Sequence, residues 1–196
     1  IFLILLFVIP VQIFAQIKLM GKNIDDYINE AMNRWKIPGM SVAVIENGRV
    51  SYIKGFGVRE LGKPEMVDEN TLFAVASNSK AFTGLSIAML ENEGKLKLDD
   101  KVSMYIPEIK MYDPVATDLL TIKDVLTHRV GIGTFQGDFI TWGTNFTESE
   151  LINKLQYFKP IYGFRSGYGY FHTGYTVAGD IIKRITGKEW AKYVKE

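Results

Sequence analysis

The sequence contains no cysteine, which excludes disulfide scaffolds, thiolate zinc sites, thiol nucleophiles and a lipid attached to an N-terminal cysteine. It also lacks an excess of either charge: 23 Lys and Arg stand against 22 Asp and Glu, so the net charge is +1. Bulk charge therefore does not drive binding to polyanions, and we expect no nucleic-acid partner. Only two histidines are present, His128 and His172, and neither has a second ligand at the spacing of a zinc motif. We expect neither a metal nor another cofactor.

Apolar residues, in contrast, are plentiful. Of the 196 residues 47% are hydrophobic and 23% are charged. This composition allows a chain to bury a core and differs from that of disordered or collagen-like proteins. Because no internal repeat or linker divides the sequence, we expect one globular domain.

The N-terminal segment 1–15 is strongly apolar: thirteen of its fifteen residues are apolar, and the first charged residue of the chain is Lys18. Such a run is shorter than the about 20 residues of a membrane-spanning helix and is typical of the apolar part of a secretory signal. We therefore expect residues 1–15 to be a signal peptide, residues 16–196 to be the mature chain, and the protein to be periplasmic or secreted. The alternative is a retained segment that anchors the protein to the membrane.

Local patterns predict both helices and strands. After Asn23, a typical N-cap residue, apolar residues recur at helical spacing as far as Trp35. Two β-rich runs, 40–46 and 49–56, are joined by Asn47-Gly48, a dipeptide that suits the positive φ angles of a two-residue hairpin turn. The fold class is therefore α/β or α+β. Further helices are predicted at 77–93, 121–127, 147–157, 173–186 and from 189 onward.

A serine and a lysine three positions apart, Ser77 and Lys80, stand at the start of the predicted helix 77–93. Residues at this spacing lie on one face of a helix with Cβ atoms about 5–6 Å apart, which lets the amine hold or accept the hydroxyl proton. Unpaired N–H groups at a helix N-terminus can also stabilise an oxyanion. The pattern therefore predicts a serine nucleophile with an amine partner.

Two other interpretations bear on this pattern. Ser77 can serve only as the helix N-cap, with Lys80 as a solvated residue of the first turn. The same spacing also occurs at Ser51 and Lys54, within the second β-rich run. Residues three apart in a strand point to opposite faces, so we do not expect this second copy to form a site.

Further elements follow the Ser-x-x-Lys pattern in order. Residues 121–131 read Thr-Ile-Lys-Asp-Val-Leu-Thr-His-Arg-Val-Gly, and His172 stands two positions after Tyr170. In this order they resemble the serine β-lactamase and penicillin-binding protein family, in particular its class C β-lactamase-like, D-aminopeptidase and esterase branches. The first is similar to the family's Thr-x-x-Asp-Leu-Leu-Thr-His-x-Ser-Gly stretch and the second to its Tyr-x-Asn element. The resemblance covers residues 23–196 and implies an antiparallel sheet flanked by helices plus a helical subdomain.

The resemblance also implies roles for individual residues. Ser77 is expected to be the catalytic nucleophile, Lys80 its amine partner, and Tyr170 the phenol that carries the proton to the leaving group. A tyrosine with a pKa near 10 is a poor base at neutral pH, so this role needs a lowered pKa, which a nearby Lys80 ammonium favours. His172 replaces the family's asparagine and is expected to bind substrate, the alternative being that it only packs. Because a protonated His172 repels Lys80, we expect acylation to decline below about pH 6.5.

The function implied by the resemblance is that of an exported serine hydrolase that forms an acyl-enzyme on Ser77 with an amide or ester. The substrate is then a small molecule or peptide, such as a β-lactam, a D-amino-acid peptide or a simple ester, and peptidoglycan is a candidate partner. The alternatives are a non-catalytic relative that binds penicillin or peptidoglycan, and a membrane-tethered envelope protein. A membrane partner is expected only if residues 1–15 are retained.

The family's later strands, one of which carries a Lys-Thr-Gly or His-x-Gly element, do not follow Tyr170 in this sequence. We therefore expect the chain to be an incomplete, N-terminal part of the hydrolase domain. A single hairpin is at best marginally stable and leaves open strand edges, so we expect this chain to be inactive and poorly soluble when expressed alone.

Overall fold

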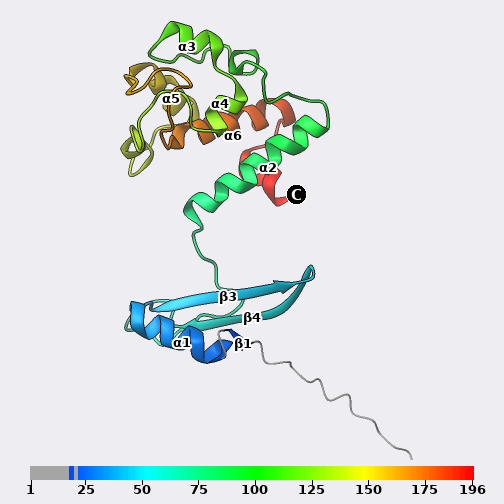
Figure 1. Ribbon diagram of the computed structural model, residues 1–196, viewed down its shortest axis with the longest axis vertical. Helices are drawn as coiled ribbons and strands as arrows, with labels where there is room; N and C mark the ends of the chain where they lie inside the picture. The colour runs from blue at the N-terminus through cyan, green and yellow to red at the C-terminus, as the bar shows by residue number, and fades with distance from the viewer. Residues whose placement is uncertain (1–17, 20–21) are drawn as a thin grey trace, which may run out of the picture. The chain divides into compact units, whose positions relative to one another are not determined.

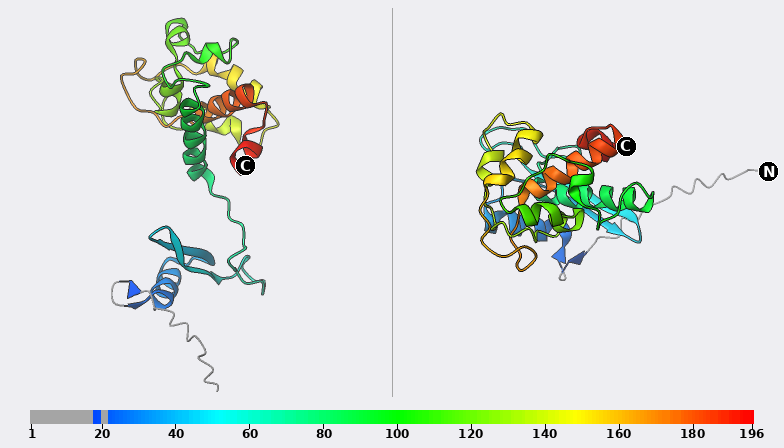
Figure 2. Two further views of the ribbon diagram at one scale, coloured as in Figure 1. Left: turned by 90° about the vertical axis from the view of Figure 1, so that its right-hand side faces the viewer. Right: turned by 90° about the horizontal axis from the view of Figure 1, so that it is seen from above.

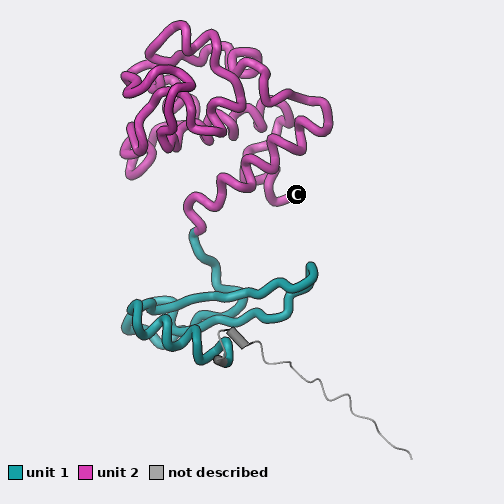
Figure 3. The backbone as a smooth tube through the Cα atoms, viewed as in Figure 1, with its two compact units in different colours: residues 1–74 teal, residues 75–196 magenta. Residues whose placement is uncertain are grey.

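The structure is a computed structural model that describes residues 18–19 and 22–196, so the predicted signal peptide lies outside the described residues. The chain forms two compact units, which Figure 3 shows in different colours: unit 1 extends to Ala74 and unit 2 covers Val75–Glu196. In the part of the chain that the structure describes, no helix has the length and apolarity needed to cross a bilayer.

Unit 1 combines one helix with two antiparallel strand pairs (Figure 1). Its elements are β1 (Lys18–Leu19), β2 (Lys22–Asn23), α1 (Ile24–Trp35), β3 (Gly39–Glu46) and β4 (Arg49–Gly57). The sequence-based prediction of this part is confirmed. The Asn23 side chain accepts a hydrogen bond from the Asp25 N–H at the start of α1, and Asn47 and Gly48 turn the β3–β4 hairpin with φ angles of 50° and 74°.

The core of unit 1 lies between α1 and one face of the hairpin. Ile24, Ile28 and Met32 are buried with Phe56, and alternate β3 residues pack against them. The Asp25 carboxylate accepts hydrogen bonds from the Tyr52 hydroxyl and from Lys54 Nζ, which ties α1 to β4. Ser51 and Lys54 have different partners, since the Ser51 hydroxyl donates to the Val44 carbonyl of β3 whereas Lys54 Nζ donates to Asp25.

Unit 2 is helical, and its helix α6 can be followed in orange to red in Figures 1 and 2. The α-helices of this unit are α2 (Ser79–Asn92), α3 (Pro114–Leu119), α4 (Ile122–Leu126), α5 (Glu148–Asn153), α6 (His172–Thr186) and α7 (Trp190–Lys195). Short 3-10 turns are η1 (Ala76–Asn78), η2 (Val102–Met104), η3 (Asp138–Thr141) and η4 (Lys154–Tyr157).

Helix α6 is the centre of the unit 2 core. Its residues Val177, Ala178, Ile181 and Ile182 are fully buried, and the helix packs against α2, α4 and α5. It ends at Gly187, which adopts the left-handed conformation with φ of 71° that suits glycine after a helix. This packing fixes the N-terminal turn of α6, where His172 lies, relative to α2.

Most predicted helices of unit 2 are present, with two differences. The predicted helix 77–93 opens with the turn η1 before α2 begins, and the predicted helix 147–157 divides into α5 and η4. Helix α3 was not predicted, although Asp113 caps it and Pro114 occupies its first turn, a combination that signals a helix start.

Candidate active site

The candidate nucleophile Ser77 lies in η1, directly before α2. The N-cap of α2 is Asn78, and the Ser77 hydroxyl forms no cap; instead its Oγ accepts hydrogen bonds from Lys80 Nζ at 3.2 Å and from the Tyr170 hydroxyl at 2.8 Å. The interpretation of Ser77 as a helix cap is therefore wrong. The preceding residue, Ala76, has a φ of 47°, a left-handed conformation that costs free energy in a residue other than glycine.

Lys80 lies in the first turn of α2 with its amine enclosed by the site. Its Nζ lies 3.2 Å from Ser77 Oγ and 3.5 Å from Nδ1 of His172. It also faces the rings of Tyr170 and Tyr175, at 4.8 and 5.2 Å from their centroids. Lys80 is therefore a half-buried member of the site, contrary to the interpretation of it as a solvated first-turn residue.

Tyr170 comes from a loop far along the chain and is held there by its backbone. Its N–H donates to the Thr134 hydroxyl at 3.1 Å, and its carbonyl accepts from the Phe135 N–H at 3.0 Å. The preceding residue must be glycine, because a Cβ on Gly169 would lie 1.9 Å from the carbonyl oxygen of Ile132. The loop therefore reaches its position only through this close backbone approach.

His128 packs against the ring of Tyr170 and helps to hold it in place. The imidazole is buried and stacks on that ring, with centroids 4.8 Å apart, and its Nδ1 accepts a hydrogen bond from the Phe171 N–H at 2.9 Å. Burial, and then the positive charge of Lys80, lower the pKa of His128, which keeps the ring neutral and its Nδ1 an acceptor. His128 is thus a positioning residue for Tyr170 and lies outside the reacting groups.

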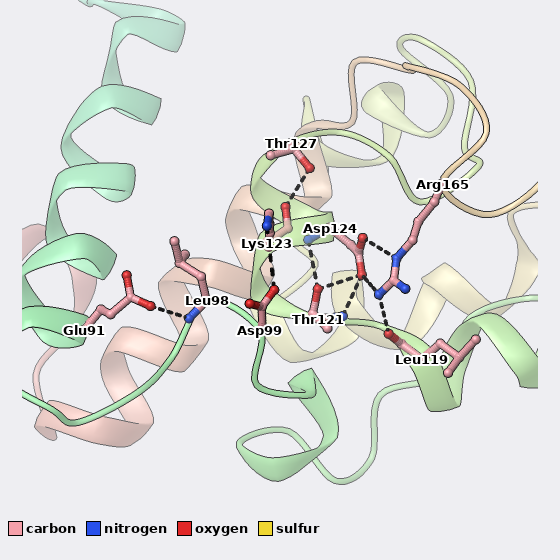
Figure 4. Close-up of polar contacts among 9 residues, drawn as sticks. All are labelled: Glu91, Leu98, Asp99, Leu119, Thr121, Lys123, Asp124, Thr127 and Arg165. Atoms are coloured by element: carbon pink, nitrogen blue, oxygen red, sulfur yellow. Dashed lines mark hydrogen bonds and ion pairs between the residues drawn. The ribbon is translucent and has the colours of Figure 1, made fainter.

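An ion pair between Arg165 and Asp124 fastens the same loop to α4 (Figure 4). Arg165 Nε donates to Oδ1 of Asp124 at 2.8 Å and its Nη2 donates to Oδ2 at 2.7 Å, while the carboxylate also closes the capping box with Thr121. Burial raises the pKa of Asp124, but the hydrogen bonds from Arg165 and Thr121 lower it by a larger amount. The pKa of Asp124 is therefore below its ordinary value. The aspartate of the 121–131 stretch thereby secures the start of the loop that ends at Tyr170.

The electrostatics of the site favour a reactive phenol. Burial raises the pKa of Tyr170, but its contacts with Lys80 and Ser77 and the charge of Lys80 lower it more, so the net direction is downward as the role requires. Burial and, to a smaller extent, the positive charge of Lys80 lower the pKa of His172, whereas the negative charge of Asp138 raises it by a smaller amount. His172 is therefore neutral at pH 7. Because its pKa is lowered, it gains a proton only below the ordinary histidine pKa of about 6.5.

A cavity of about 600 Å³ opens beside Ser77 and Tyr170. Most of the residues that line this cavity come from the segment between the 121–131 stretch and Tyr170, and the sequence did not predict them as part of a site. The one available signal was the concentration of aromatic residues over 135–142. The residues that line the cavity are Ala76, Ser77, Phe135, Asp138, Phe139, Trp142, Tyr170 and His172. Elsewhere, no three His, Asp or Glu side chains of the described residues come together as metal ligands.

Comparisons with known proteins identify the family of the chain. The Beta-lactamase family model matches residues 24–196. Protein flp of Staphylococcus aureus strain NCTC 8325 is 32% identical over 179 residues, which are 88% of this chain and 35% of that protein. The chain thus spans about a third of the length of this curated relative.

Two solved structures extend the likeness to the fold. The octameric penicillin-binding protein homologue from Pyrococcus abyssi is 30% identical with a TM-score of 0.73, over 87% of this chain and 40% of that one. A class C beta-lactamase is 32% identical with a TM-score of 0.70, over 85% of this chain and 44% of that one. The chain has the corresponding α/β fold in incomplete form.

Proposed function

The chain belongs to the beta-lactamase family of serine hydrolases, and from this premise we propose that the complete protein forms an acyl-enzyme on Ser77 with an amide or ester substrate. The observation that carries the proposal is the convergence of three groups. The hydroxyl of Ser77 lies within hydrogen-bond reach of both the Lys80 amine and the Tyr170 phenol, although Tyr170 is 93 positions away in the chain. This is the arrangement of a nucleophile with its base.

In the proposed acylation step, the phenolate of Tyr170 accepts the proton of the Ser77 hydroxyl while Oγ forms a bond to the substrate carbonyl carbon. Lys80 stabilises the phenolate before the transfer. The negative charge moves to the carbonyl oxygen, where the backbone N–H of Ser77 supplies one donor to the oxyanion.

The leaving group then departs. The bond from the carbonyl carbon to nitrogen or oxygen breaks, Tyr170 returns its proton to the departing amine or alkoxide, and the acyl group remains as an ester on Ser77. Deacylation reverses these roles: water gives a proton to the Tyr170 phenolate as it attacks the ester, and Ser77 regains a proton as it leaves. His172 contributes by contact with substrate and with Lys80.

Substrate and location form part of the same proposal. The substrate is a β-lactam, a D-amino-acid peptide or an ester. Peptidoglycan fragments are candidate partners because they contain such peptides. Residues 1–15 act as a signal peptide that directs the protein to the periplasm or to the exterior. N-terminal sequencing of the secreted product tests the export step, because cleavage after Ala15 gives a chain that begins at Gln16.

Covalent labelling tests the acyl-enzyme. The protein expressed from its complete gene is incubated with a fluorescent fluorophosphonate and, separately, with a fluorescent penicillin, and the labelled peptide is mapped. Label on Ser77 that is lost in Ser77→Ala and retained in Ser51→Ala is the expected result, because Ser51 has the same sequence spacing to a lysine but lies in a strand. Absence of label from Ser77 with both reagents contradicts the proposal.

A further inference from the structure

The cavity beside Ser77 has an unusual wall of exposed aromatic rings. Phe135, Phe139 and Trp142 line it and are 62%, 83% and 71% exposed. Large aromatic side chains are normally buried, and those that face an open cavity together mark a binding surface for apolar groups. The wall adjoins the nucleophile, so a group bound there belongs to the molecule that Ser77 attacks.

One carboxylate lies within this aromatic wall. Asp138 is the only Asp or Glu among the described residues that line the cavity. Its Oδ1 is buried and has no hydrogen-bond partner among the described residues, which leaves the carboxylate under-satisfied. Its negative charge also tends to raise the pKa of Tyr170 and of His172, which line the same cavity.

Aromatic faces and a carboxylate together recognise a particular chemistry. The faces attract cations as well as apolar surface, and a carboxylate without a hydrogen-bond partner forms strong hydrogen bonds with an ammonium. No lysine or arginine lines the cavity among the described residues, and Lys80, whose Nζ lies 3.2 Å from Ser77 Oγ, is not part of the aromatic wall.

We propose that this cavity binds the acyl group of the substrate, and that this group combines an apolar body of aromatic size with an amine that pairs with Asp138. The inference rests on the proposed function and narrows it to amides and esters of aminoacyl type. The acyl group is the part assigned to the cavity because it remains bonded to Ser77 Oγ, which lines the same cavity, after the leaving group departs.

A substrate panel tests this assignment in the protein expressed from its complete gene. The panel contains phenylalanine p-nitroanilide, its N-acetyl derivative and alanine p-nitroanilide, each as both enantiomers. The wild type is expected to prefer the free amine to the N-acetyl compound, and the phenylalanine side chain to that of alanine, each by about tenfold or more in kcat/KM (about 1.4 kcal/mol).

Two variants test separately how the cavity recognises the amine and how it recognises the apolar body of the substrate. Asp138→Asn is expected to remove most of the preference for the free amine, measured as the ratio of kcat/KM for the free-amine compound to kcat/KM for the N-acetyl compound. Trp142→Ala is expected to reduce the preference for phenylalanine over alanine. The matched controls are Asp118→Asn and Trp35→Ala, which change exposed residues outside the cavity and leave both preferences unchanged.

Labelling of Ser77 by a fluorophosphonate, measured on every variant, separates the two proposals. Labelled wild-type protein that shows no preference for the free amine overturns the inference and leaves the hydrolase function standing. The inference also fails if Asp138→Asn slows both compounds equally, because Asp138 then acts on the charge of Tyr170 rather than on the substrate. Absence of label from Ser77 overturns both proposals.

Discussion

Replacement of Arg165 by methionine removes the ion pair that fastens the Tyr170 loop to α4. The substitution deletes two charge-assisted hydrogen bonds to Asp124, at 2.7 and 2.8 Å, and a third bond to the carbonyl of Leu119 at 3.0 Å. Asp124 keeps the hydrogen bonds from Thr121, so the capping box of α4 survives. The change therefore tests the clamp without removing the helix cap.

The expected cost lies between two limits. Breaking a buried ion pair costs about 3–5 kcal/mol, whereas exposed pairs contribute about 0–1 kcal/mol. The Asp124 side chain is 8% exposed and that of Arg165 is 44% exposed, so the pair is screened from one side only. We expect Arg165→Met to lower the free energy of unfolding by about 2 kcal/mol.

The pH dependence of this loss has a definite sign. The pKa of Asp124 in the folded protein is lowered below its ordinary value, so its stabilising contribution is present above pH of about 4 and is lost as the pH falls through the folded pKa. The difference in stability between the wild type and Arg165→Met should therefore narrow below about pH 4.

Urea denaturation of the two proteins at pH 7 and pH 3 measures both effects, with hydrogen exchange of the 165–171 amides as a local readout. Lys101→Met is the matched control, since its partner Asp118 is 74% exposed and the expected loss is below about 1 kcal/mol. Equal losses in Arg165→Met and Lys101→Met, or a difference that stays constant from pH 7 to pH 3, would refute the reasoning.

Two further substitutions test the loop and the histidine. Gly169→Ala places a Cβ 1.9 Å from the Ile132 carbonyl oxygen, so it should lower the free energy of unfolding by about 1–3 kcal/mol and slow acylation. Gly84→Ala is the control, because open space surrounds Gly84 and the substitution should change neither quantity. Wild-type values for Gly169→Ala in both assays would contradict this prediction. Because His172 Nδ1 faces Lys80 Nζ at 3.5 Å, wild-type acylation should fall more steeply on acidification below pH 6.5 than that of His172→Asn, and identical pH–rate profiles remove the idea.

The parts of the fold that the sequence predicted correctly depend on local signals. The hairpin follows from alternation and from Asn47-Gly48, since both act within a few residues of the turn. The pairing of Ser77 with Lys80 is local in the same way, because one helical turn brings the two side chains together. The unpredicted helix α3 carried a readable signal in its capping aspartate and following proline.

The remainder of the site depends on contacts between distant segments. Tyr170 and His172 were identified only through resemblance to a family, since nothing local distinguishes them from other aromatic loop residues. The support that His128 gives to Tyr170 and the carboxylate of Asp138 beside the nucleophile arise when loops separated by more than 30 positions fold against each other. Periodicity and turn chemistry carry no information about such pairings.

The rate of acylation by a chromogenic ester in Tyr170→Phe, measured by rapid mixing on the protein expressed from its complete gene, tests most directly whether the phenol acts with Ser77 and Lys80. Loss of the hydroxyl should slow acylation by about 10²–10⁴-fold at pH 7, the range typical of a lost general base. Tyr168→Phe, which changes an exposed phenol in the same loop, should leave the rate within about threefold. A rate in Tyr170→Phe equal to that of Tyr168→Phe would contradict the catalytic role of Tyr170.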